Sequence, residues 1–451
     1  MSKNVTIVGA GLIGSLMSVF LAKKGYVVDV FEKRPDPRIS VMESGRSINM
    51  ALSNRGIKAL KEVGLDQLVL NNTVPMKGRM IHDEEGQVHF QPYGEEGEMI
   101  YSVSRGQLNK LLMEKADEYE NVHFHFNHRC LDPVFDKNQI AFQKGENGEI
   151  VHHDYSVLIG ADGAFSAVRT AMMKTDRFNY AQEYLEHGYL ELTIPAKNGK
   201  HVLDKNALHI WPRHTYMLIA LPNMDGSFTA TLFLPFQGEV SFEALSNGEK
   251  VMAFFQKHFP DVVPLIPDLI KDYYQKPPSS LLTVKAYPWT CNHNALLIGD
   301  AAHAIVPFYG QGMNAGFEDC YTLNGLLEES GHDWAASIKL FEQVRKQDAD
   351  AIAELALRNF IEMRDKVADA KFLLRKKIEG LIHQKLGKRY LPLYTMVTFS
   401  DMSYSEALRL GNHQDEIMNN IMATPGIEQL WDKEDFWHVI EKQVEELYQY
   451  Y

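Results

Sequence analysis

Three glycines near the start of the chain have the spacing of a phosphate-binding turn. Gly9, Gly11 and Gly14 follow a run of strand-forming residues, 5–8, and precede an apolar helix pattern. Glycines in this setting let backbone N–H groups and a helix N-terminus approach a pyrophosphate. Glu32 stands 18 residues after Gly14, close to the roughly 20-residue spacing at which a carboxylate reaches an adenosine ribose hydroxyl. The pattern predicts a dinucleotide site, but on its own it fits NAD, FAD or no ligand at all.

A second glycine-rich stretch, far along the chain, has the character of a flavin site. Residues 296–299 read as a buried strand that delivers Asp300, whose carboxylate can accept hydrogen bonds from ribityl hydroxyls. The loop at 307–314 then enters a helix through Gly310 and Gly312. Such a helix start presents N–H groups and a positive dipole to the flavin pyrimidine, where reduced flavin carries its negative charge.

A third strand ends in a glycine turn at residues 157–163, with Asp162 in the turn and a short helix pattern after it. Ordinary turn chemistry can explain each of these turns alone, because glycine adopts conformations that other residues avoid. Three of them at strand ends in one chain go beyond that explanation. Together they predict an FAD site.

The order of strand and helix patterns predicts an α/β protein. We expect a Rossmann-like FAD-binding domain built from discontinuous segments at 1–73, 101–177 and 285–330. Residues 74–100 and 178–284 predict a substrate domain with an antiparallel β-sheet, because short strand patterns alternate there with turn residues. Residues 331–451 predict a helical C-terminal region, because charged residues interrupt every apolar segment.

The composition limits the classes of partner and compartment. The 451 residues are 45% hydrophobic and 23% charged, which allows a large core. A formal charge of -13 repels phosphate backbones and anionic lipid surfaces, so we expect no nucleic-acid partner. Cys130, Cys291 and Cys320 lie far apart and form no CxxC pair, so neither a disulfide framework nor a zinc knuckle is indicated. This cysteine usage suits the cytoplasm.

Two segments bear on membrane association. Residues 5–22 are uncharged and near the minimum length of a spanning helix. The glycines in that stretch and the strand pattern at 27–31 explain the same apolarity as the buried strand–helix–strand start of the first domain. Residues 406–451 are charged and amphipathic. We therefore expect no membrane anchor in this chain, and we expect a monomer or a homodimer.

Histidines offer alternative chemistry. His123 and His125 share one face of a strand pattern and could begin a metal site, but no carboxylate or cysteine is placed to join them, so no metal is expected. His303 is expected to pack or to form a hydrogen bond rather than to act as an acid–base catalyst. The Gly-x-Ser-x-Gly pattern of a nucleophile elbow is absent.

The three strand–glycine segments together resemble the single-component flavoprotein aromatic hydroxylases, the p-hydroxybenzoate hydroxylase type. Longer strings resemble, more narrowly, the kynurenine 3-monooxygenase family, over residues 5 to 405 or so. These strings are far more specific than a glycine motif, and they lie at 45–53, 79–82, 208–213, 307–320 and 392–400.

The resemblance implies non-covalent FAD and places it on residues of all three glycine segments and their neighbours. These residues are Gly9, Gly11, Ile13, Gly14, Glu32, Ala51, Arg105, Asp162, Asp300, Gly312, Met313 and Asn314.

The resemblance also assigns six residues to the substrate: Arg79, Tyr93, Asn359, Tyr394, Phe308 and Gln311. Arg79 and Tyr93 would hold the amino-acid carboxylate, with Asn359 and Tyr394 closing over it, while the last two would line the aromatic-ring pocket. A guanidinium fork plus a phenol hydroxyl suits a carboxylate that must be gripped. Without the family, Arg79 reads as a surface ion-pair residue and Tyr93 as a turn residue.

The reaction that the resemblance implies is hydroxylation of L-kynurenine to 3-hydroxykynurenine in tryptophan degradation. NADPH would reduce FAD, O2 would add at flavin C4a, and the hydroperoxide would hydroxylate the ring, so no catalytic side chain is expected. Only one dinucleotide fingerprint is present, so NADPH is expected to bind transiently.

Three readings stay open besides this one. The chain could hydroxylate another aromatic substrate, act as a flavin oxidase on a different ring, or be a non-catalytic Rossmann-like binding protein. In addition, residues 406–451 depart from the apolar membrane-anchoring tail of eukaryotic members of the family.

Overall fold

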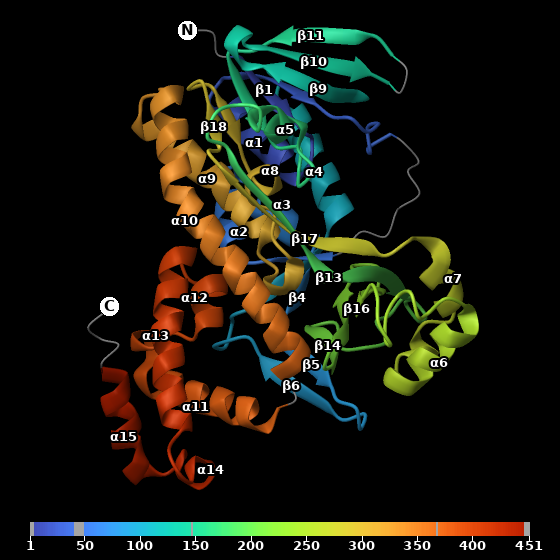
Figure 1. Ribbon diagram of the computed structural model, residues 1–451, viewed down its shortest axis with the longest axis vertical. Helices are drawn as coiled ribbons and strands as arrows, with labels where there is room; N and C mark the ends of the chain where they lie inside the picture. Colours follow the sequence, from blue (N-terminus) through green and yellow to red (C-terminus); the bar gives the residue numbers. More distant parts are fainter. Residues whose placement is uncertain (1–3, 40–48, 146–147, 367–368, 446–451) are drawn as a thin grey trace.

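In this computed structural model, the described residues form four β-sheets with helices packed around them (Figure 1). The structure describes residues 4–39, 49–145, 148–366 and 369–445. The family-like string at 45–53 therefore lies outside the described residues as far as position 48.

A six-stranded sheet of Rossmann type, in the upper half of Figure 1, has the strand order β18-β19-β12-β1-β2-β8. All neighbours pair in parallel except β18 and β19. The strands are β1 (Asn4–Val8), β2 (Val27–Phe31), β8 (Val122–His125), β12 (Val157–Gly160), β18 (Thr290–Cys291) and β19 (Ala295–Leu297). The predicted strands at 5–8, 27–31 and 157–160 are confirmed, and β19 shows that the chain returns to this sheet late in the sequence.

Seven of the helices that the structure describes belong to this part of the molecule. They are α1 (Leu12–Lys23), α2 (Asn54–Glu62), α3 (Asp66–Leu70), α4 (Arg105–Asp117), α5 (Ala167–Met172), α8 (Asp300–His303) and α9 (Gly312–Glu329). Helix α1 carries no charged residue before its last position and is buried over most of its length. The uncharged stretch at 5–22 is therefore the buried strand–helix start that the sequence predicts.

A seven-stranded sheet forms the second layer, in the order β17-β13-β16-β15-β14-β5-β6. Its strands are β5 (Gly78–His82), β6 (Val88–Pro92), β13 (Asn179–Ile194), β14 (Ala207–Arg213), β15 (Tyr216–Pro222), β16 (Phe228–Pro235) and β17 (Ser279–Tyr287). The expected antiparallel sheet is confirmed with one exception, because β5 pairs in parallel with β14. The strand β5 comes from a segment far earlier in the chain, so no local pattern reveals this pairing.

Three further features were not expected from the sequence. Two small helices, α6 (Gly248–His258) and α7 (Leu269–Gln275), pack their apolar side chains into a core with the seven-stranded sheet. A three-stranded sheet is formed by β9 (His128–Val134), β10 (Gln139–Lys144) and β11 (Ile150–Asp154), and another by β3 (Asn49–Leu52), β7 (Ile100–Ser104) and β4 (Val74–Met76).

The C-terminal region is helical, as predicted. It contains α10 (Trp334–Ile361), a short π-helix (Glu362–Lys366), α11 (Ala370–Leu386), α12 (Leu393–Phe399), α13 (Tyr404–Met422), α14 (Ile427–Leu430) and α15 (Glu434–Glu445). Figure 1 shows α10 running from beside the first sheet down toward β5, with the later helices gathered on the same side. Within the described ranges, we find no helix with both the length and the apolar character that crossing a bilayer requires. The exact limits of the domains stay a prediction.

Candidate active site

The glycine turn after β1 is closed by backbone contacts on two sides and open on a third. Gly9 has a φ of +102°, and a Cβ added there would lie 2.5 Å from the carbonyl oxygen of Ala161. A Cβ on Gly14 would lie 1.9 Å from the carbonyl oxygen of Gly9. A Cβ on Gly11 would meet no described atom within 4 Å, and no side chain caps α1 at this residue. The uncapped N–H groups of α1 therefore adjoin open space, as a pyrophosphate site requires.

Glu32 lies beside this turn, as its spacing predicts. Its carboxylate accepts hydrogen bonds from the N–H of Ala10 at 3.0 Å and from Nε of Arg34 at 2.8 Å. Burial favours the neutral acid, but Arg34 and the backbone N–H groups outweigh it, so the pKa of Glu32 lies below its ordinary range. A buried, ionised carboxylate at the turn is suited to accept hydrogen bonds from ribose hydroxyls.

The first and second glycine segments, 9–14 and 296–314, meet at Ile13. A Cβ added to Gly299 would lie 3.0 Å from the Ile13 side chain, and one added to Gly316 of α9 would lie 2.4 Å from it. Gly299 has a φ of +59°, and its N–H donates to Asp319 at 2.9 Å. Asp300 follows as the first residue of α8 and is exposed. The structure thus brings two segments nearly three hundred residues apart to the same place.

The start of α9 is tied to β3 by Asn314. Its Nδ2 donates to the carbonyl oxygen of Ala51 at 2.8 Å, and its Oδ1 accepts from the N–H of Ser53 at 2.9 Å. Asn314 is fully buried, so its side chain fixes the loop. Gly312 begins the helix and Met313 is buried. No described side chain caps this helix, so its first N–H groups remain available to a flavin pyrimidine.

Two other predicted cofactor residues have different surroundings. The carboxylate of Asp162 accepts hydrogen bonds from Oγ of Ser166 at 2.5 Å and from the N–H of Ala167 at 2.6 Å, so it holds the start of α5. Its Cα lies against the glycine turn, 2.8 Å from a Cβ built on Gly9. Arg105 is the first residue of α4 and is exposed. The roles of all the assigned residues toward FAD stay predictions.

Arg79 on β5 lies against stacked tyrosine rings. Its Cζ is 4.8 Å from the ring centroid of Tyr394 and 5.6 Å from that of Tyr93. These two rings stack at 5.3 Å with an angle of 12° between their planes, and Tyr309 also stacks on Tyr394, at 5.6 Å. Burial opposes the charge of Arg79, but Tyr394, Tyr93 and Glu362 outweigh it, so the pKa of Arg79 is raised. The structure therefore brings together three residues that the sequence assigns to the substrate.

This aromatic clamp, Arg79 with Tyr93 and Tyr394, contains polar atoms that have no partner. Nε of Arg79 and the hydroxyl of Tyr93 are buried, and neither has a partner with good hydrogen-bond geometry among the described residues. Burial, reinforced by Tyr394 and opposed by Arg79, raises the pKa of Tyr93, so the hydroxyl is a proton donor at neutral pH. Buried donors without acceptors are costly. A ligand carboxylate would satisfy both groups.

An aromatic cluster adjoins the clamp, because Tyr309, which stacks on Tyr394, follows Phe308 directly. Phe308 stacks on Phe360 at 4.2 Å and contacts Phe233 at 5.0 Å. Asn359, which the sequence assigns to the substrate, donates from Nδ2 to the carbonyl oxygen of Phe308 at 2.7 Å. Asn359 therefore holds the backbone of this cluster in this structure. Gln311 is buried and precedes α9.

Four residues at this site were missed by the sequence analysis. Tyr309 follows Phe308, and Phe360 follows Asn359. An aromatic residue directly beside a position assigned to the substrate is a local signal that could have identified both of them. Arg55 and Tyr404 had no local signal, because their contacts join segments hundreds of residues apart.

The histidines have ordinary structural partners. Nε2 of His303 is 2.6 Å from Oδ2 of Asp319, which confirms the expected hydrogen-bonding role. His125 pairs with Asp29 at 2.9 Å. In the part of the chain that the structure describes, no group of three His, Cys, Asp or Glu side chains could hold a metal ion.

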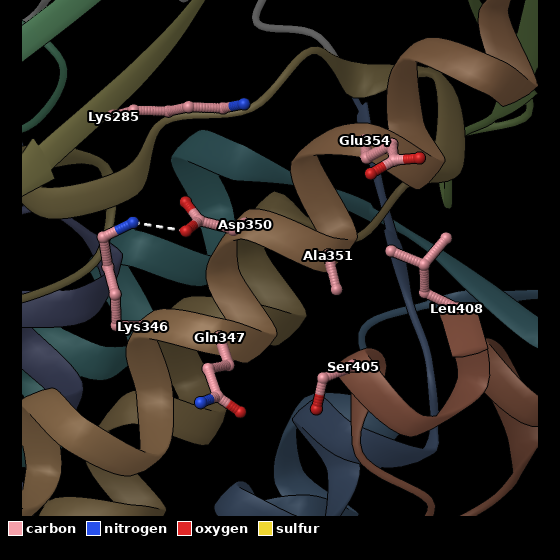
Figure 2. Close-up of a pocket in the computed structure, with 8 residues that line it drawn as sticks. All are labelled: Lys285, Lys346, Gln347, Asp350, Ala351, Glu354, Ser405 and Leu408. Carbon is pink, nitrogen blue, oxygen red and sulfur yellow. Dashed lines mark hydrogen bonds and ion pairs between the residues drawn. The ribbon is translucent and has the colours of Figure 1, made fainter.

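An open cavity of about 440 Å³ lies between α10, β17 and α13 (Figure 2). Figure 2 shows Lys346 paired with Asp350 on α10, while Lys285 reaches over from β17. None of the residues assigned to FAD or substrate lines this cavity. Lys346 pairs with Asp350, and Glu354 pairs with Arg358, so these charges are already engaged with protein groups.

Comparison with known proteins gives concordant results. The family described as FAD binding domain matches residues 2–249 and 273–356. Kynurenine 3-monooxygenase of Flavobacterium johnsoniae is 48% identical over 449 residues, covering 99% of each chain. That of Cytophaga hutchinsonii is 50% identical over 438 residues, covering 96% of this chain and 97% of the relative.

A solved structure, the tetrameric form of 2-methyl-3-hydroxypyridine-5-carboxylic acid oxygenase, has the same fold. It aligns with a TM-score of 0.67 at 18% identity, covering 82% of this chain and 95% of that one. Sequence identity of 48–50% over nearly the full length, together with the matched FAD-binding domain, shows that the chain belongs to the kynurenine 3-monooxygenase family of FAD-dependent monooxygenases.

Proposed function

We propose that this chain hydroxylates L-kynurenine to 3-hydroxykynurenine, using NADPH and O2 with FAD as its bound cofactor. The observation that carries the proposal is the pair of unpartnered buried donors, Nε of Arg79 and the hydroxyl of Tyr93. Kynurenine is an amino acid with an aromatic ring, and its carboxylate would satisfy those donors while the ring enters the adjoining pocket of Phe308 and Phe360.

The residues present fit FAD. Glu32 would hold the adenosine ribose, the open side of Gly11 would admit the pyrophosphate, and the uncapped start of α9 at Gly312 would face the flavin. When bound, FAD takes up reducing equivalents from NADPH and activates oxygen, which no amino-acid side chain can do.

The side chains then have the task of positioning. Arg79 and Tyr93 would fix the carboxylate end of kynurenine, which sets where the far ring carbon lies. Asn359 keeps Phe308 in place through its carbonyl, so the wall of the ring pocket is rigid. The ring amino group of kynurenine donates electron density to the carbon ortho to it, so no side chain needs to remove a proton first. The packed aromatic side chains around this pocket exclude water from the reacting atoms.

We further propose that the chain is a monomer or homodimer and works in the cytoplasm. Its three cysteines are free thiols, which suits a reducing compartment, and its charge of -13 disfavours nucleic acids. Light scattering of the purified protein measures the mass in solution. A stable assembly larger than a dimer would contradict the first part of this proposal.

The decisive test of the reaction is flavin reduction without oxygen. The purified yellow protein is mixed anaerobically with NADPH, with and without L-kynurenine, and flavin bleaching is followed. We expect kynurenine to accelerate bleaching and, in air, to gain one oxygen atom by mass. A panel of other aromatic acids covers the alternative substrates. Acceleration by a different acid would transfer the proposal to that substrate, substrate loss without oxygen gain would indicate an oxidase, and protein that never binds FAD would reject the reaction.

A further inference from the structure

Tyr404 connects the C-terminal helices to the loop that precedes α9. It is the first residue of α13, is fully buried, and its hydroxyl donates to Oε1 of Gln311 at 2.9 Å. Gln311 also donates from Nε2 toward Oγ of Ser53 at 3.4 Å. The side chain of Gln311 is therefore held at both ends, directly before the helix whose N-terminus fits the flavin.

Arg55 on α2 joins Tyr404 to the helix that carries the clamp residue Tyr394. Its Cζ lies 4.0 Å from the ring centroid of Tyr404. It donates from Nε to the carbonyl oxygen of Val397 at 2.9 Å and from Nη1 to Oε1 of Glu318 at 2.8 Å. Val397 belongs to α12, the helix that carries Tyr394, and Glu318 belongs to α9. One buried guanidinium thus binds the clamp helix, the flavin-facing helix and the Tyr404 ring.

The backbone at Tyr404 is fixed as well. Ser405 donates from its N–H at 3.0 Å and from Oγ at 2.6 Å to Oδ1 of Asp348 on α10. Asp348 in turn accepts from Arg345 at 3.3 Å. Because the start of α13 is anchored, the Tyr404 hydroxyl can shift only together with the helices around it. These contacts give a displacement of α12 a route to Gln311 through Arg55 and Tyr404.

We infer that Tyr404 and Arg55 are positioning residues that couple occupation of the aromatic clamp to the placement of Gln311 at the start of α9. This inference rests on the proposed function, because it takes the clamp ligand to be kynurenine. Tyr394 stacks on Tyr93 and faces Arg79, so a carboxylate bound there contacts α12 directly. Arg55 contacts α12 and the Tyr404 ring, and the Tyr404 hydroxyl contacts Gln311, so the two residues form a buried link from α12 to the flavin side of the site.

The test compares two buried tyrosines, one whose hydroxyl makes a hydrogen bond at the site and one, elsewhere in the fold, whose hydroxyl makes none. Tyr404→Phe removes a buried hydroxyl that makes a hydrogen bond. Tyr273→Phe removes a buried hydroxyl on α7 that makes none with any described residue. Three quantities are measured on FAD-loaded protein: the kynurenine Kd from the change in flavin absorbance, the amplitude of that change, and the ratio of hydrogen peroxide to hydroxylated product.

A fourth measurement does not depend on turnover. Hydrogen exchange of the peptide covering residues 305–316 is followed with and without kynurenine, because protection there reports the order of the loop itself. Tyr394→Phe alone and the double variant Tyr394→Phe/Tyr404→Phe complete a double-mutant cycle. This cycle measures the coupling between the clamp and the loop.

In Tyr404→Phe we expect a kynurenine Kd close to that of the wild type, but a smaller change in flavin absorbance. Kynurenine should no longer protect residues 305–316 from hydrogen exchange. The ratio of peroxide to product should rise about fivefold, which is the size of effect that the loss of one buried hydrogen bond allows. Tyr273→Phe should match the wild type in every measurement. If Tyr404→Phe also matches the wild type, or if the double variant shows purely additive effects, the inference is overturned while the proposed function stands. A wild-type protein that ignores kynurenine overturns both.

Discussion

At the scale of single residues, the unusual feature of this protein is a guanidinium that stacks on tyrosine rings without an ion-pair partner among the described residues. Surface arginines commonly meet carboxylates, as Arg38 does with Asp36 and Asp117. Arg79 instead faces Tyr93 and Tyr394, and its Nε is buried without an acceptor. The missing acceptor is what a carboxylate ligand would supply.

We expect Arg79→Ala to weaken kynurenine binding by roughly 2–4 kcal/mol, because two charge-assisted hydrogen bonds are lost in a desolvated site. FAD binding should be unchanged, since Arg79 lies on β5 and the glycine turns lie on other elements. Titration of the flavin absorbance with kynurenine measures the first quantity, and titration of apoprotein with FAD the second. Arg79→Lys keeps the charge but loses the planar fork, so it should recover only part of the affinity. Unchanged kynurenine affinity in Arg79→Ala would remove the clamp from the site.

Glu32 gives a prediction with a pH dependence. Its pKa is lowered in the folded protein despite burial, because Arg34 and the N–H of Ala10 stabilise the ionised form. A carboxylate with a depressed folded pKa contributes stability above its unfolded value, which is near 4.5, and loses it as the pH falls through the folded pKa. The difference in melting temperature between the wild type and Glu32→Gln should therefore be constant from neutral pH down to the unfolded pKa near 4.5. At lower pH the difference should shrink, because the carboxylate becomes protonated. Thermal scans in a pH series, without added FAD, measure this. A difference that grows toward acid pH would contradict the assigned ionisation.

At the scale of elements, the strand–turn–helix at the N-terminus contains one glycine that the fold requires and another that leaves space for a ligand. Gly14 has no room for a methyl group, because its Cβ would lie 1.9 Å from the carbonyl oxygen of Gly9. Gly11 has room, since nothing described lies within 4 Å of its Cβ position, and its φ of -74° suits any residue. The two glycines therefore serve different purposes in the same turn.

We expect Gly14→Ala to destabilise the protein even without cofactor, and Gly11→Ala to leave the apoprotein as stable as the wild type while FAD affinity falls at least about tenfold, because the added methyl group occupies the phosphate approach. Thermal unfolding of apoprotein and FAD titration separate the two effects. Equal behaviour of the two variants would show that the open side of Gly11 is not the cofactor side.

The same turn shows what the sequence can predict. Local rules predict the glycine segments, because each combines a buried strand with a turn that favours glycine. The structure brings the first and second of them together at Ile13. The parallel pairing of β5 with β14 and the contact of Arg55 with Tyr404 were beyond those rules, because they depend on segments hundreds of residues apart. The clamp residues Arg79 and Tyr93 were assigned through family resemblance alone, since their own surroundings in the sequence favour surface roles.

At the scale of the whole molecule, buried charges join the FAD-binding part to the C-terminal helices. Arg345 on α10 donates to Glu318 and Asp319 of α9, each through a separate nitrogen, at 2.8 and 2.9 Å. Asp319 also accepts the N–H of Gly299 at the flavin turn. Burial raises the pKa of Asp319, but His303 and Arg345 outweigh it, so the pKa of this carboxyl is lowered. A chain of charges thus runs from the flavin turn to the helices that carry Tyr394 and Tyr404.

Removing Arg345, the central cation of these buried charges, should destabilise the whole protein rather than one element. Arg345→Met removes the cation that Glu318, Asp319 and Asp348 share, and leaves Glu318 with Arg55 and Asp319 with His303 alone. We therefore expect a loss of about 3–5 kcal/mol in the free energy of unfolding. Lys58→Met breaks an ion pair with Asp401 that also connects α2 to the C-terminal part but is exposed, so it should cost no more than about 1 kcal/mol. Both variants are unfolded by urea at the same saturating FAD concentration, because bound FAD itself stabilises the native state. Equal losses in the two variants would mean that the buried charges do not hold the two parts together, since an exposed ion pair would then contribute as much as the buried network.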